Sequence, residues 1–146
     1  MLGRSLRFVV ALGVLGIAVT GCKITGGGWI PGANGGKATF TVTWDTDKSG
    51  AGQLQYVDKS AGVAFHAVAG DPQCGFAPSA PAGGGTAVFL GNYRTSTGGS
   101  GGLFVFVTDN NGDHTPDSIS LSICSGPYFG YSNSGPLGGN VRVLTS

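Results

Sequence analysis

KATFTVTWD, from Lys37 to Asp45, is the clearest β-strand in this sequence. Its apolar and polar side chains alternate, and the apolar ones are Ala38, Phe40, Val42 and Trp44. Because successive side chains of a strand point to opposite faces, this alternation predicts a strand with one face against a core and the other in water. The threonines between the apolar positions suit the exposed face, since β-branched residues favour strands.

Similar short strands are predicted along the rest of the chain. The stretches with alternating apolar residues are Gln53 to Asp58, Val63 to Ala67, Thr86 to Tyr93, Ser118 to Cys124 and Val141 to Leu144. Leu103 to Thr108 is apolar at consecutive positions, which predicts a strand in mid-sheet that is buried on both faces. Ile24 to Ile30 is either a flexible glycine tether or an edge strand ending at Pro31, and we expect the strand.

Glycine and proline separate these stretches. The 146 residues include 29 Gly and 7 Pro. Irregular structure is predicted from Gly70 to Gly85, and a loose loop from Thr95 to Gly102. Glycine-rich turns between many short strands are typical of a sandwich or a barrel. We predict an all-β fold, specifically an immunoglobulin-like antiparallel β-sandwich of about eight or nine short strands.

The N-terminus has the pattern of a signal peptide. Arg4 and Arg7 precede a continuous apolar run, Phe8 to Val19, which small residues and Cys22 follow. The run is shorter than the roughly 20 residues that span a bilayer as a helix. An ordinary signal peptide cut nearby, or an uncleaved N-terminal anchor, would show the same charge and apolar pattern. The length that follows predicts a single domain over residues 22–146.

The last four residues of this segment add a more specific signal. Val-Thr-Gly-Cys at positions 19–22 resembles the lipobox of bacterial lipoproteins. The resemblance implies that residues 1–21 are a lipoprotein signal peptide and that Cys22 receives a diacylglycerol and becomes the new N-terminus. The protein would then be anchored through lipid to the outer leaflet of a bacterial membrane. Lys23 in place of Asp favours the outer membrane, by resemblance to Gram-negative lipoproteins.

A second resemblance covers nearly all of residues 24–144. It rests on ITGGGWIP at 24–31, GQLQYVD at 52–58 followed by GVAFH at 62–66, TDN at 108–110 before DSISL at 117–121, and GPYFGYSNSGPLGGNVRV at 126–143. Together these motifs resemble the post-choice-of-anchor (post-COAP) domain of secreted and cell-wall-linked bacterial proteins. They are glycine-turn and strand patterns, so the resemblance implies a fold more than a function. No catalytic residue is carried over from this family.

Two cysteines remain after Cys22. In an oxidising compartment two thiols in a small domain favour a disulfide. Cys124 has the parity of the outward serines of its strand, and the irregular segment from Gly70 could fold over that face and present Cys74. We therefore predict a Cys74–Cys124 bridge, with a reactive thiol or a metal-binding pair as the alternative.

The charged residues limit the classes of function. A formal net charge of +1 and scattered Lys and Arg make no basic stripe, so no nucleic-acid footprint is predicted. His66 lies on the polar side of its strand, and His114 lies in a polar turn. No nucleophile elbow, phosphate loop or His-Glu-x-x-His motif occurs. We expect a non-enzymatic structural or ligand-binding role. The alternative is a small periplasmic or surface hydrolase, in which a histidine meets two aspartates.

One oxygen-rich group of residues falls between two predicted strands. Asp109, Asn111, Asp113 and Asp117 are spaced as alternate ligands in a short loop. Calcium takes six to eight oxygen ligands, and such a loop can supply several. The loop lacks the closing Glu of an EF-hand, and Asp and Asn also favour turns for backbone reasons. The segment is thus either a calcium site or a plain hairpin turn, and we expect the turn.

A cluster of aromatic residues lies near the C-terminus. Tyr128, Phe129 and Tyr131 occur among Gly, Ser and Asn. Exposed aromatics stack on sugars or peptides, so a surface glycan or a protein is a candidate partner. The alternative is that Tyr128 and Tyr131 cap the end of the core, and we favour it. The sequence identifies no ligand-binding residue.

Overall fold

The computed structural model describes residues 22–45, 52–79, 85–110 and 114–145. The predicted signal peptide, residues 1–21, lies outside the described residues, and so do Asn111 and Asp113 of the proposed calcium loop. Within the described ranges no helix is long and apolar enough to cross a membrane.

The described chain is all-β. Its strands are β1 (Cys22–Pro31), β2 (Lys37–Asp45), β3 (Gly52–Asp58), β4 (Val63–Ala69), β5 (Thr86–Arg94), β6 (Ser100–Thr108), β7 (Ser118–Ile123), β8 (Ser132–Pro136) and β9 (Gly138–Thr145). One 3₁₀ turn, η1 (Lys59–Ala61), joins β3 to β4. The predicted all-β, antiparallel class is confirmed.

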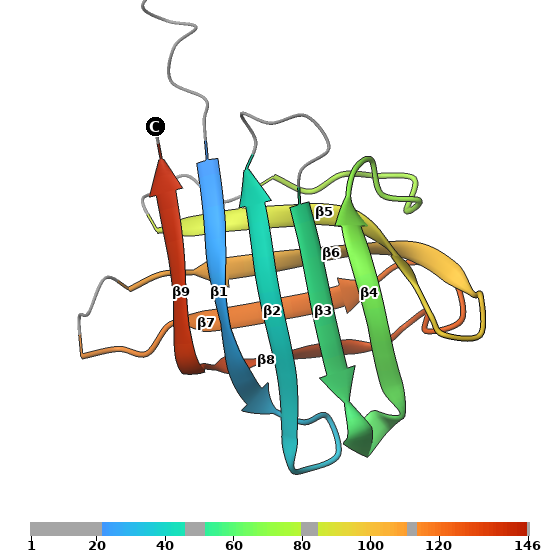
Figure 1. The fold of residues 1–146 in the computed structure, drawn as a ribbon, viewed down its shortest axis with the longest axis horizontal. Coiled ribbons are helices and arrows are strands. Elements are labelled where there is room, and N and C mark those ends of the chain that lie inside the picture. Colours follow the sequence, from blue (N-terminus) through green and yellow to red (C-terminus); the bar gives the residue numbers. More distant parts are fainter. Residues whose placement is uncertain (1–21, 46–51, 80–84, 111–113, 146) are drawn as a thin grey trace, which may run out of the picture.

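All nine strands belong to one antiparallel sheet with the order β8-β7-β6-β5-β4-β3-β2-β1-β9. The sheet folds over into two layers, with β9 and β1 to β4 in front and β5 to β8 running across them behind (Figure 1). Only four positions of β4 pair with β5, from His66 opposite Arg94 to Ala69 opposite Gly91. This short pairing is the corner at which the sheet turns from one layer to the other.

The core lies between the two layers. In β2 the inward residues Ala38, Phe40 and Val42 are buried and alternate with exposed threonines, as the sequence predicts. The largest fully buried side chains are Tyr56 of β3 and Tyr93 and Phe89 of β5. Burial of such side chains from both layers supplies the main favourable term for folding.

β1 is an interior strand. The prediction of a strand over residues 24–30 is confirmed, but its placement at an edge is wrong, because β9 pairs along its other side. A Cβ atom at Gly26 or Gly28 would collide with the β9 backbone, at Asn140 or Gly138 respectively. Both glycines have positive φ, so their freedom lets β9 approach β1 closely.

The loop predicted from Thr95 to Gly102 is shorter than expected. β6 already begins at Ser100, which pairs with Arg94, so the turn spans only residues 95–99. The hydroxyl of Thr95 accepts a hydrogen bond from the Gly99 amide at 3.0 Å and closes this turn. The sequence predicts Gly101 and Gly102 to be loop residues, but they occupy buried strand positions where a side chain would collide with neighbouring atoms.

β6 is buried on its inner face and only partly on its outer face. Leu103, Val105 and Val107 point into the core, whereas Phe104 and Phe106 are half-buried on the outside. Full burial on both faces, predicted from the apolar run, is therefore wrong. The ring of Phe76, from the loop after β4, contacts Phe104 edge-on at 5.7 Å between ring centroids and gives partial cover.

The predicted disulfide is confirmed. Cys74 and Cys124 form a bridge across a sequence separation of 50 residues. Both sulfurs lie over Gly102, where a Cβ atom would meet them. The bridge ties the loop after β4 to the end of β7 and, by chain entropy for that length, contributes roughly 4 kcal/mol at most.

Two C-terminal strands differ from the prediction. β8, with sequence SNSGP, has no apolar alternation and was not predicted; it forms because its backbone pairs with β7, for example Ser134 opposite Ser120. β9 begins at Gly138, earlier than the predicted Val141. In both cases backbone pairing with a neighbouring strand outweighs weak local strand preference.

Candidate functional site

The outer face of the front layer, with the adjoining corner at β5, presents a set of polar, mostly uncharged side chains. We define this polar face as eight of the polar residues of β1 to β5 that point away from the core, namely Thr25, Thr41, Thr43, Gln53, Gln55, His66, Asn92 and Arg94. All are exposed except Asn92, which is half-buried. Hydroxyl and carboxamide groups both donate and accept hydrogen bonds, so the face can bind a polar ligand.

Strand register arranges these side chains in two rows. Thr41, Gln55, His66 and Arg94 are register partners across β2, β3, β4 and β5. Thr25, Thr43, Gln53, Val68 and Asn92 form the parallel row. Neighbouring strands lie about 4.8 Å apart, so each row places its functional groups at a regular spacing on a rigid support.

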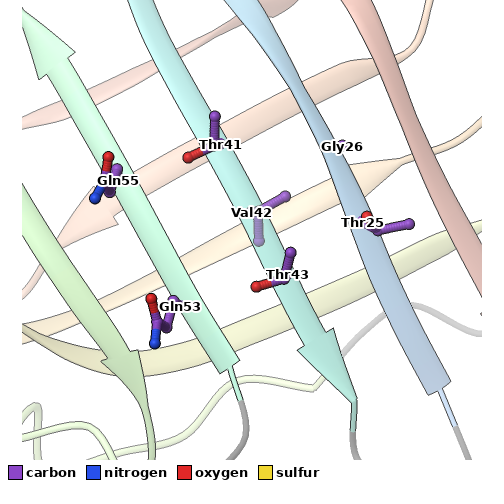
Figure 2. Close-up of a pocket in the computed structure, with 7 residues that line it drawn as sticks. All are labelled: Thr25, Gly26, Thr41, Val42, Thr43, Gln53 and Gln55. Atoms are coloured by element: carbon purple, nitrogen blue, oxygen red, sulfur yellow. The ribbon is translucent and has the colours of Figure 1, made fainter.

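A shallow hollow of about 290 Å³ lies on this face over β1, β2 and β3. Figure 2 shows Thr41, Thr43, Gln53 and Gln55 on the near side of the sheet, while Val42 points to the far side, where it is buried. Gly26 adds no side chain to the hollow. The hollow is lined by hydrogen-bonding groups, without an acidic or basic side chain among its lining residues.

Some polar groups of the face already have partners. Nε2 of His66 lies 3.3 Å from Oε1 of Gln53. The Asn92 carboxamide accepts from the Gln73 amide at 2.9 Å and donates to the Asp71 carbonyl at 2.8 Å, so it holds the disulfide-bearing loop. Within the described ranges the side chain of Gln55 makes no hydrogen bond and remains available to a ligand.

The two histidines that the hydrolase alternative would use have different surroundings. His66 lies on the polar face beside Gln53, and His114 is exposed at the start of the segment that leads to β7. The part of the chain that the structure describes contains no group of three His, Cys, Asp or Glu residues able to hold a metal ion.

The carboxylates of Asp109 and Asp117 bind backbone amides. Oδ2 of Asp109 accepts from the Val143 amide at 3.1 Å, and Oδ2 of Asp117 accepts from the Val141 amide at 3.1 Å. Val141 and Val143 belong to β9, which is an edge of the sheet. The two aspartates thus cap amides that would otherwise be unpaired at this edge. A calcium site that uses them remains a prediction, since Asn111 and Asp113 are not described.

Two tyrosines of the C-terminal aromatic segment cap the core, which is the alternative that the sequence analysis favours. Tyr128 stacks on Tyr93 at 5.7 Å, and Tyr131 contacts Tyr56 edge-on at 6.0 Å. Phe129 differs from both, with 74% of its surface exposed. The segment therefore contributes mainly to the core rather than to an aromatic binding surface.

A buried polar network lies beside these tyrosines. The Asp58 carboxylate is completely buried and accepts hydrogen bonds from Ala33, Ser60 and Tyr131. Burial by itself would raise the pKa of Asp58, but the hydrogen bonds to the carboxylate outweigh it and lower the pKa below its ordinary value. Burial, together with the bonds to Asp58 and Tyr56, strongly raises the pKa of Tyr131. The network is fully bonded and positions loops, so we assign it a structural role.

Sequence reasoning selected His66 but not the other members of the polar face. Threonine and glutamine at alternate positions look like ordinary solvent-facing strand residues. The signal that could have found them is repetition, because TFTVT and QLQ place hydroxyls and carboxamides on the same side of two consecutive strands.

Comparison with known proteins gives no match, whether with protein-family models, with curated proteins or with solved structures.

Proposed function

We propose that this chain is a lipid-anchored module of a bacterial surface whose role is to bind a polar ligand, without catalysis, through the polar face. The observation that carries the proposal is the exposed pair of rows of hydroxyl and carboxamide groups on paired strands. Paired strands hold such groups in place before binding, which reduces the entropy lost when a ligand binds. Sugars, whose hydroxyls need both donors and acceptors, are the ligand class that fits best.

The anchorage part of the proposal rests on the lipobox at residues 19–22. β1 begins at Cys22 itself, whose backbone pairs with Thr145 of β9. A lipid on Cys22 would therefore place the sheet directly at the membrane surface, without a spacer. Membership of the post-COAP family belongs to the same proposal and is supported by the motifs at residues 24–31 and 126–143.

The finer fold assignment is also a proposal. An immunoglobulin-like sandwich has two sheets with Greek-key connections. The two layers support a sandwich-like core, whereas the next-neighbour strand order from β1 to β8 favours a single sheet that is nearly closed. The polar face has the same composition in either description.

Binding to glycans tests the proposed function. The lipid-free protein, residues 22–146 with Cys22→Ser, is applied to a glycan array and to cell envelopes of the producing bacterium. A variant with Thr43→Ala, Gln53→Ala and Gln55→Ala should lose at least about tenfold in affinity, because each lost hydrogen bond contributes about 1 kcal/mol. A control with Ser120→Ala, Ser122→Ala and Ser134→Ala alters the opposite outer face and should bind as the wild type does.

Two results would contradict the proposal. If the polar-face variant binds every envelope preparation as well as the wild type does, the face is not a binding site. If incubation with the wild type releases new reducing ends from a bound glycan, and Gln substitution of His66 stops the release, the alternative hydrolase is correct.

A further inference from the structure

One end of the polar face carries a basic pair. His66 of β4 and Arg94 of β5 are register partners at the corner between the two layers. Two hollows meet at this pair. One, of about 610 Å³, extends from the pair over Val68, Gln73 and Asn92. The other, of about 470 Å³, extends over Gln55, Thr95 and Ser96.

The charge of Arg94 is not neutralised within the described chain. The salt bridge that the described residues form is between Lys23 and Asp45, and Arg94 takes part in none. No aspartate lines either hollow. Asp71 is close in the fold, but the group that contacts the face is its backbone carbonyl, which binds Asn92. The guanidinium is therefore free to receive an anion from solution.

Arginine is suited to a particular anion geometry. Its planar guanidinium offers two parallel N–H groups that match a carboxylate or a phosphate. Beside it, Ser96 provides a hydroxyl and His66 a ring in the second hollow, whereas the Thr95 hydroxyl is already bonded within its own turn. An anion at Arg94 would thus meet these two groups beside the guanidinium, with no competing carboxylate among the residues that line the hollow.

The ligand can extend from this point along the polar face. From Arg94 the row continues through His66 and Gln55 to Thr41, three strand spacings or about 14 Å away. The groups beyond His66 are uncharged, so the ligand needs one acidic group at Arg94 and neutral hydrogen-bonding groups elsewhere. A nucleic acid or a polyacidic peptide would instead require several cations along the row.

We propose that Arg94 and His66 form the anion-binding end of the polar face and select an acidic glycan, one that carries a carboxylate or a phosphate on its sugar chain. This inference rests on the proposed function, because it names the class of ligand for the same face.

Isothermal titration of the lipid-free protein tests the inference with four polymers. Polygalacturonate supplies sugar carboxylates, its fully methyl-esterified form is the neutral match, poly(glycerol phosphate) supplies phosphates, and polyglutamate is an acidic peptide. We expect binding to at least one of the first and third polymers, and at least tenfold weaker binding to the methyl ester and to polyglutamate. The better of the two acidic polymers identifies carboxylate or phosphate as the preferred group.

Variants separate a site from general charge attraction. Arg94→Gln should weaken binding to the acidic polymer at least tenfold, and Arg94→Lys should restore part of it. Lys59→Gln is the matched control: it removes the same charge from the turn η1, away from both hollows and from the polar face, and should change affinity less than twofold. Arg94 and Lys59 are both exposed, so both variants should keep the wild-type melting temperature.

Several outcomes would overturn the inference while leaving the proposed function standing. They are equal affinity for polygalacturonate and its methyl ester, an equal loss of affinity in Arg94→Gln and Lys59→Gln, and failure of the wild type to bind either acidic polymer although envelopes still bind through Gln53 and Gln55. Preference for polyglutamate would assign a peptide in place of a glycan. If the polar-face triple variant also binds envelopes normally, the proposed function fails as well.

Discussion

The hydroxyl of Tyr131 donates a 2.6 Å hydrogen bond to Oδ2 of Asp58. Because the Tyr131 hydroxyl has only this one proton, it must accept in its 2.6 Å contact with Tyr56, so the Tyr56 hydroxyl donates there. The Tyr56 oxygen in turn accepts a hydrogen bond from the Asn133 carboxamide at 3.0 Å. The direction of every hydrogen bond in the series from Asn133 to Asp58 is thereby fixed. This series of hydrogen bonds links β8 to the C-terminal end of β3 and, through the Ala33 amide, to the turn after β1.

Asp58→Asn should lower the free energy of unfolding by about 3 kcal/mol, measured by urea denaturation, since a buried carboxamide presents N–H groups to donors. Asp71→Asn changes an exposed carboxylate and serves as the control, with an expected effect within about 0.5 kcal/mol. An equal effect of the two substitutions would show that the buried network does not stabilise the fold.

The same group gives a pH dependence with a defined sign. The pKa of Asp58 is lower in the folded protein than its ordinary value of 3.8. The ionised carboxylate therefore makes its full contribution to the free energy of unfolding above that value. The contribution is lost as the pH falls through the lower, folded pKa. Stability of the wild type should therefore fall below about pH 4, and Asp58→Asn should flatten that part of the curve. Parallel curves for both proteins would contradict the assignment.

Tyr131→Phe should destabilise the protein more than Tyr56→Phe does. Loss of the Tyr131 hydroxyl removes a donor to Asp58 and the acceptor of Tyr56, whereas loss of the Tyr56 hydroxyl leaves Asn133 its second bond, to the Pro31 carbonyl at 2.9 Å. We expect about 2 kcal/mol for the first and about 1 kcal/mol for the second in denaturant unfolding. The reverse order would mean that the bond directions are assigned wrongly.

Asp117 gives a test of how the sheet edge is closed. One carboxylate oxygen accepts from the Asn110 amide at 2.9 Å and the other from the Val141 amide. Asp117→Asn keeps the shape but turns one acceptor into a donor, so the free energy of unfolding should fall by about 1–3 kcal/mol. Hydrogen exchange should quicken at Val141 more than at Val105 in the middle of the sheet. Unchanged exchange at Val141 would exclude the capping role.

The sequence predicted the strands well and the polar face poorly, for one physical reason. The alternation of apolar and polar residues in KATFTVTWD indicates which side chains are buried, and this pattern lies within one short stretch of sequence. The alignment of Gln55, His66 and Arg94 depends on register across three strands and on the corner at β4 and β5. No local pattern encodes that alignment, and none encodes β8, which is held by backbone pairing with β7 and by the hydrogen bonds of Asn133.

Calcium should be tested at the turn between β6 and β7. If the turn binds the ion, millimolar calcium should raise the melting temperature, because a ligand that binds only the folded state stabilises it, and Asp113→Ala should abolish the rise. We expect no rise in melting temperature, because the carboxylates of Asp109 and Asp117 already accept hydrogen bonds from backbone amides, with which calcium would have to compete. A rise that Asp113→Ala removes would establish a calcium site.

Lipid attachment can be measured directly in cells. Labelled palmitate should enter the full chain and not the Cys22→Ala variant, because only a cysteine thiol at the predicted cleavage site can carry the lipid. A double variant, Cys74→Ser with Cys124→Ser, removes the disulfide thiols and should keep the label, which separates Cys22 from the other cysteines. Labelling of Cys22→Ala, or of neither protein, would disprove the lipoprotein assignment. Secretion of unlabelled wild type would then identify residues 1–21 as part of an ordinary signal peptide.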